Sequence, residues 1–137
     1  MLPPIADVRA TAEAYRDWFW PGLVLPAIEW AGLPAAEAAY DAPTARYPHG
    51  RIRLARRLGG TWEWRACLLH ELVHAALEPW VGEAEYPDGR VPYHGPAFVA
   101  ECNRIGGLLG LPYLDADDGY GWPWLLLQPE YDLDVDQ

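Results

Sequence analysis

Residues 67–77, with the sequence CLLHELVHAAL, place three ionisable side chains inside a segment that is otherwise almost wholly apolar. Such a segment predicts a core helix, in which an ionisable group is costly unless a partner compensates it. His70 and His74 are four residues apart, so on a helix they project to one face, about 40° from each other. Glu71 follows His70 directly. The chain must therefore fold around a buried helix that has a polar site on one side.

Two imidazoles on one helical face can direct their nitrogens at a single zinc ion, at about 2.0–2.1 Å. Glu71 projects about 100° away from His70, where it can hydrogen-bond a water molecule at the metal without binding the metal itself. This HExxH arrangement is typical of zinc hydrolases. It predicts Zn²⁺ as the cofactor, His70 and His74 as ligands and Glu71 as the catalytic base. The alternative interpretation is a helix with two satisfied histidines and a surface glutamate.

A catalytic zinc site needs a third protein ligand and an open position for water. We favour His94, because it precedes the next predicted helix, where a loop reversal can bring it over the first. Glu101 is the alternative, and it would make the site similar to that of thermolysin. The metzincin pattern would require Gly and His where this chain has Leu77 and Trp80, so that class is excluded.

Hydrophobic periodicity predicts helices in three parts of the chain. The first covers residues 5–20, and the segment 61–79 returns to helical spacing with Thr61 as its N-cap and Pro79 at its end. In the third helix Pro96 suits the first turn and Gly106 the C-terminal cap.

Three short segments between the first two helices are predicted to be strands, each closed by Gly or Pro. They cover residues 23–32, 36–43 and 50–58. In the third segment Ile52 and Leu54 alternate with Arg51 and Arg53, which is the pattern of a sheet with one solvated face. A further strand is possible over residues 124–128.

The formal net charge of the chain is −10 at pH 7, and its basic residues are all arginines. Six of the arginines fall within residues 46–65, and no base follows Asp115. A protein that binds nucleic acid on its own normally carries a basic excess, so autonomous DNA binding is disfavoured. The arginine cluster is interpreted as a solvated strand face, with an acidic partner as the alternative.

Length and composition indicate one domain over residues 1–137, with a core in about residues 5–110 and an acidic tail over 111–137 that is rich in Trp and Pro. The apolar runs are shorter than the roughly 18 residues that a membrane span requires. Because the N-terminal residues lack the pattern of a secretory signal, we expect a cytoplasmic location. Cys67 and Cys102 are too few for a disulfide framework and are expected to be free, buried thiols.

The sequence LLHELVHAAL, followed by HGPAFVAECNRIGG, resembles the SprT-like, or Spartan-type, metallopeptidases, whose pattern is HExxH and then a His-Gly-x-x-Phe helix. The resemblance covers roughly residues 5–110. It implies a zincin-like α+β fold: an N-terminal helix, a small three-stranded sheet of antiparallel type, the HExxH helix and a helix supplying the third ligand. Carried over by position, His70, His74 and His94 would bind zinc and Glu71 would be the base. Many relatives also have a zinc ribbon or a basic DNA-binding region, and this sequence contains neither.

The expected activity is zinc-dependent hydrolysis of peptide bonds in a protein or peptide substrate. An extended substrate is expected to pair with the third strand, residues 50–57, if that strand is a free edge, which makes Arg51 and Arg53 substrate-binding candidates. A donor for the oxyanion is also expected. Its candidates are Tyr93, Tyr113 and Tyr120.

Two other hypotheses remain open. One is a catalytically idle, zinc-containing interaction domain, which a protein side chain in the fourth zinc position would favour. The other is a nucleic-acid-associated protease, which needs the arginine cluster to form a continuous positive face beside the cleft. The sequence does not indicate the natural substrate or the oligomeric state.

Overall fold

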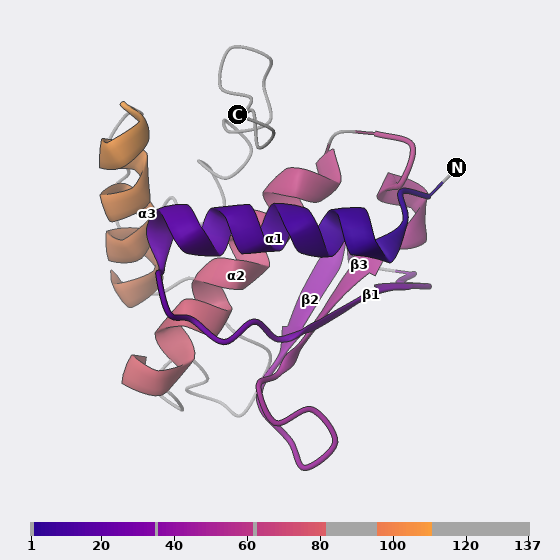
Figure 1. Ribbon diagram of the computed structural model, residues 1–137, viewed down its shortest axis with the longest axis horizontal. Helices are drawn as coiled ribbons and strands as arrows, with labels where there is room; N and C mark the ends of the chain where they lie inside the picture. Colours follow the sequence, from indigo (N-terminus) through magenta and orange to yellow (C-terminus); the bar gives the residue numbers. More distant parts are fainter. Residues whose placement is uncertain (1, 35, 62, 82–95, 111–137) are drawn as a thin grey trace.

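The computed structural model describes residues 2–34, 36–61, 63–81 and 96–110 (Figure 1). These residues form an α+β fold of three α-helices, a short 3-10 helix and a three-stranded sheet. In chain order the elements are α1 (Ile5–Phe19), β1 (Ala27–Ala31), β2 (Ala38–Asp41), β3 (Arg51–Ala55), η1 (Arg56–Leu58), α2 (Glu63–Val81) and α3 (Pro96–Leu109). The tail and the possible strand at 124–128 lie outside the described residues.

The sheet has the strand order β1-β3-β2, so β3 is central. β2 pairs with β3 antiparallel, with Tyr40 opposite Ile52, whereas β1 pairs with β3 parallel, with Ile28 opposite Ile52. The three predicted strands are confirmed, but the predicted antiparallel type is wrong, because the sheet is mixed. Successive strands reverse direction, and β3 then inserts between its two predecessors, which makes β1 and β3 parallel.

The two faces of the sheet differ in polarity. Ile52 and Leu54 are fully buried on the face that packs against α2. The opposite face carries Arg51 and Arg53, whose guanidinium groups both donate to the carboxylate of Asp41, with Nε to Oδ2 distances of 3.0 and 2.9 Å. This confirms the prediction of one apolar and one solvated face.

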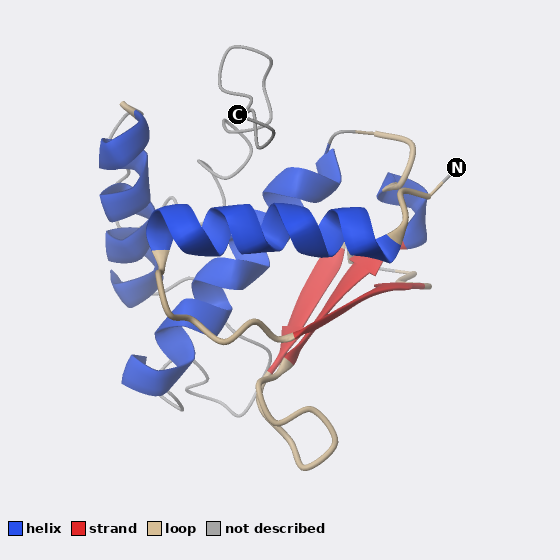
Figure 2. Ribbon diagram, in the orientation of Figure 1, coloured by secondary structure: helices blue, strands red, loops and turns tan. Residues whose placement is uncertain are grey.

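Two of the three helices, α1 and α2, pack directly against the sheet, and the third packs against α2. α1 packs against β1 and α2, and α2 packs against β2 and β3. α3 packs against the side of α2 away from the strands (Figure 2). The predicted spacing of α1 is confirmed, because Val8, Ala12, Tyr15 and Phe19 are all buried. Helix α2 is thus surrounded by the sheet and both other helices.

The predicted start of α2 agrees with the structure, but the C-terminal ends of α2 and α3 differ from the prediction. At the start of α2 the Thr61 hydroxyl accepts a hydrogen bond from the backbone nitrogen of Glu63, as an N-cap does. The helix does not end at Pro79 but continues two residues further, to Val81, so that the proline lies in its last turn. α3 begins at Pro96 as predicted but runs past Gly106 to Leu109. Gly110, at φ +73°, takes the left-handed position that had been expected of Gly106.

Among the described residues, no helix combines the length and the apolar character that crossing a membrane requires.

Gly50 precedes β3 in a conformation that only glycine adopts easily. Its φ is +83°, and a Cβ at this position would lie 2.8 Å from the Asp41 carbonyl oxygen and 2.9 Å from Cε1 of Tyr40. We predict that Gly50→Ala lowers the free energy of unfolding by about 1–3 kcal/mol, measured by urea denaturation. Gly60→Ala is the control, because nothing lies within 4 Å of its added Cβ. Equal stability of the two variants would contradict this prediction.

Candidate metal centre

Helix α2 is apolar on most sides because it is buried on most sides. Leu68, Leu69, Leu72 and Val73 have no exposed surface. A helix enclosed by a sheet and two other helices needs apolar residues all round, which explains the long apolar run in the sequence. Within HELVH, Glu71 and His74 are therefore buried, and His70 is partly buried.

His70 and His74 lie next to each other on α2, as their spacing predicts. Their ring centroids are 5.3 Å apart. His74 is 5% exposed, whereas His70 is only partly buried. Both rings pack against the fully buried ring of Phe98 from α3, at centroid distances of 4.9 Å for His70 and 4.6 Å for His74. The two imidazoles therefore face the start of α3.

Tyr40 contributes a second aromatic contact to the same histidine. Its ring is stacked on that of His74, with centroids 6.5 Å apart and an interplanar angle of 15°. Burial raises the pKa of the Tyr40 phenol, and the carboxylates of Glu78 and Asp41 add to this, so the phenol stays neutral. Tyr40 was not predicted as a site residue. The sequence indicates only that Tyr40 belongs to a short strand. It does not indicate which residue of the helix lies opposite this tyrosine.

Glu71 is also buried, with 8% of its surface exposed. Burial, together with the carboxylate of Asp41, raises the pKa of Glu71 to about 8. The alternative interpretation that required a surface glutamate is therefore wrong on this point. A cation near the two histidines would act in the opposite direction, because a positive charge favours the ionised carboxylate.

The described residues contain no complete group of metal ligands. Within residues 2–34, 36–61, 63–81 and 96–110, no three His, Cys, Asp or Glu side chains come together as a metal-binding group. His94, the predicted third ligand, lies outside these ranges. Glu101, the alternative ligand, pairs with Arg104 on α3 and does not join His70 and His74. The Glu101 alternative therefore receives no support from the described residues and stays a prediction.

The prediction that substrate pairs with the third strand is wrong, because the backbone of β3 is paired on both sides. Arg51 forms ion pairs with Asp41 and Glu29, and Arg53 pairs with Asp41. A substrate would have to compete with these carboxylates, so the role of the two arginines stays a prediction. The oxyanion candidates Tyr93, Tyr113 and Tyr120 lie outside the described residues.

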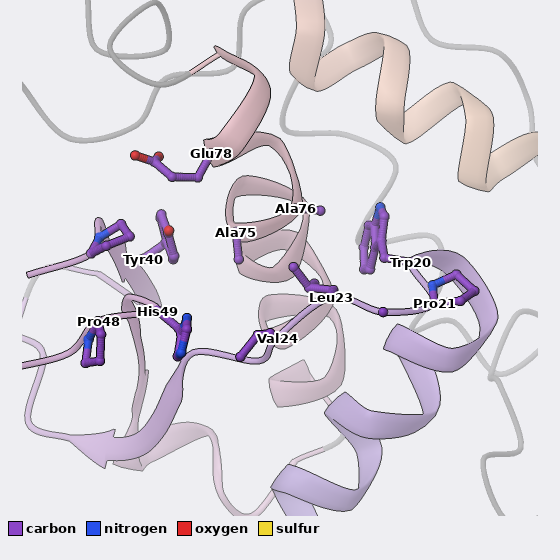
Figure 3. Close-up of a pocket in the computed structure, with 12 residues that line it drawn as sticks. Trp20, Pro21, Leu23, Val24, Tyr40, Pro48, His49, Ala75, Ala76 and Glu78 are labelled. Carbon is purple, nitrogen blue, oxygen red and sulfur yellow. The ribbon is translucent and has the colours of Figure 1, made fainter.

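A cavity of about 710 Å³ lies beside Tyr40 and the residues of α2 that follow His74 (Figure 3). It is bounded by residues 20–24 after α1, by residues of α2 that follow His74, and by residues at the ends of the strands. Tyr40, which stacks on His74, is one of its walls. His49 is exposed and lines the cavity.

Both cysteines are free and buried, which confirms the prediction. The Sγ atom of Cys67 lies 3.8 Å from a carboxylate oxygen of Glu37. Burial raises the pKa of each thiol, so neither is a ready thiolate ligand.

The chain was compared with known proteins: no family model matches it, and no curated protein matches it either.

Phe98 holds the two histidine rings against the core. We predict that Phe98→Ala lowers the free energy of unfolding by about 3–5 kcal/mol, because it leaves a cavity against both rings. Phe98→Leu retains most of the apolar volume and should cost less than about 1.5 kcal/mol. Urea denaturation of the metal-free protein measures both changes. Equal losses in the two variants would show that the ring of Phe98 is not what fills this space.

Proposed function

We propose that this protein is a zinc-dependent metallopeptidase. The observation that carries the proposal is the buried group on α2: two histidines side by side with a buried glutamate between them in sequence. Clusters of ionisable side chains in a core occur preferentially at functional sites. Imidazole nitrogen is a preferred ligand of zinc, so a zinc ion is the proposed occupant of this site.

The resemblance to the SprT-like family supports the same proposal. Phe98 stands at the Phe position of the His-Gly-x-x-Phe pattern, and its ring contacts both His70 and His74. The beginning of α3 therefore lies at the histidines. His94 is four residues earlier in the chain than Phe98, so we propose it as the third ligand.

When bound, zinc would lower the pKa of water and polarise the scissile carbonyl. Glu71 is proposed as the base that takes a proton from water as it attacks that carbonyl. The same carboxyl can then pass the proton to the leaving amine nitrogen. Because Glu71 is only 8% exposed, bulk water has little access to the carboxyl group that would hold the proton.

β2 is the proposed platform for an extended substrate, in place of β3. Among the described strands it pairs only with β3, so its other edge carries backbone groups without a strand partner there. Such an edge can bind an extended peptide through main-chain hydrogen bonds. Since Tyr40 of β2 stacks on His74, a peptide on this edge would pass close to the histidines.

The hypothesis of a nucleic-acid-associated protease receives less support from the arginine cluster. Arg51 and Arg53 pair with the carboxylates of Asp41 and Glu29, so two positive charges are balanced by two negative charges. These two guanidinium groups therefore contribute little to a continuous positive face. The idle interaction domain remains the alternative, and catalysis separates it from the peptidase.

Glu71→Gln is expected to abolish peptide hydrolysis while the protein still binds one zinc ion, because glutamine keeps the shape of the side chain but cannot accept the proton. Cleavage of an unfolded protein substrate, followed by gel electrophoresis, measures the loss, which should be at least about 100-fold. Metal content by native mass spectrometry is the control. Unchanged cleavage would exclude Glu71 as the base, and absence of cleavage by the parent protein with zinc bound would favour the interaction domain.

The proposed role of His94 has its own test. His94→Ala is expected to reduce zinc affinity about 10- to 1,000-fold, in line with the loss of one of three protein ligands. Competition with a chromogenic chelator measures this affinity. His49→Ala is the matched control, because it removes the remaining histidine of the chain, which is exposed. If the two variants bind zinc equally well, the third ligand is another residue.

A further inference from the structure

The cavity beside Tyr40 has the composition of a pocket for an apolar side chain. Its walls include Trp20, Leu23 and Val24 from the segment after α1, and Ala75 and Ala76 from α2 (Figure 3). Its volume, about 710 Å³, lies within the range of about 300–1,000 Å³ that is usual for ligand pockets. The small side chains of the two alanines leave this space open on the surface of α2.

The pocket lies next to the candidate metal centre. Ala75, Ala76 and Glu78 follow His74 on the same helix, within little more than one turn. Tyr40 separates the two sites, since its ring is stacked on His74 and also forms a wall of the pocket. An occupant of the pocket would therefore lie one aromatic ring away from the histidines.

The pocket also lies where β2 ends. Two residues at this end of the strand line the pocket. Tyr40 is the buried residue of β2, and Pro43 follows the strand closely in sequence. Side chains of an extended peptide alternate between the two sides of the chain, so every second one would point to the face on which Tyr40 lies. A peptide on the β2 edge can thus direct one side chain into the pocket while its backbone remains paired.

We propose that this pocket receives one large apolar side chain of the peptide substrate, aromatic or long aliphatic, and so determines which peptide bond of the substrate is hydrolysed. This inference rests on the proposed peptidase function. An acidic side chain is disfavoured, because Glu78 lies at the pocket and its carboxylate would repel it. A small polar side chain would leave most of the apolar wall uncovered and would gain little by binding.

Binding to the zinc-loaded Glu71→Gln protein tests the inference without cleavage. The probes are fluorescently labelled, unstructured peptides of one sequence, in which Phe, Leu, Ser, Asp or Arg is placed at each position in turn. Fluorescence anisotropy measures the dissociation constants. One position should prefer Phe and Leu over Ser and Asp by about tenfold or more, as expected for burial of a large apolar side chain.

A matched pair of variants locates this preference in the pocket. Val24→Asp places a carboxylate in the pocket wall at a residue that is 58% exposed, so the fold should tolerate it. The preference should then fall at least about threefold. Leu108→Asp introduces the same charge at a residue of α3 that is 64% exposed and does not line the pocket, and should leave the preference unchanged. Ala76→Leu, which fills the pocket, is a second variant and should weaken binding of the Phe peptide.

The outcomes separate the pocket from the proposed function. The inference is overturned if no peptide binds, if no position prefers an apolar residue, if Arg is preferred at the selective position, or if Val24→Asp and Leu108→Asp behave alike. Cleavage by the parent protein without any positional preference would overturn the pocket alone. Apolar-selective binding without cleavage would overturn the peptidase and leave the pocket as a peptide-binding site.

Discussion

The structure depends on the burial of one helix that is not wholly apolar. α2 packs against the sheet, α1 and α3, and its apolar residues form the centre of the core. The same packing buries His74 and Glu71 and brings Phe98 and Tyr40 against the histidine rings. The ring of His74 packs against both Tyr40 and Phe98, and the ring of His70 packs against Phe98. The position of any ligand at this site is thus set by the packing of the core.

Much of the fold follows from hydrophobic patterns within single segments of the sequence. The spacing of Val8, Ala12, Tyr15 and Phe19 predicts the buried face of α1, and the alternation around Ile52 and Leu54 predicts the two faces of β3. Both were confirmed because they depend on neighbours in sequence. The order of the strands depends on the insertion of β3 between β1 and β2, and no local sequence pattern indicates this insertion. The mixed sheet, and the edge of β2 that has no strand partner among the described residues, could therefore be learned only from the structure.

In the candidate site, too, some features follow from local sequence and others from tertiary packing. HELVH predicted that His70 and His74 share a face and that Glu71 lies beside them, because the geometry of one helix determines this. Tyr40 and Phe98 belong to other elements, so their contacts with His74 depend on tertiary packing. The cavity also combines segments that are distant in sequence, from residues 20–24 to Glu78. Sequence therefore indicates the chemistry on the helix, and the structure adds what surrounds it.

The central claim is that two histidines of α2 and one further histidine hold a zinc ion that leaves room for solvent. Zinc K-edge X-ray absorption of the native protein tests this most directly. The account predicts about three imidazole nitrogens at about 2.0–2.1 Å and at least one further oxygen from solvent. A scatterer at about 2.3 Å would indicate a thiolate ligand, and a shell of four protein ligands would indicate a closed structural site. Either result, or a protein isolated without any bound metal, would contradict the account.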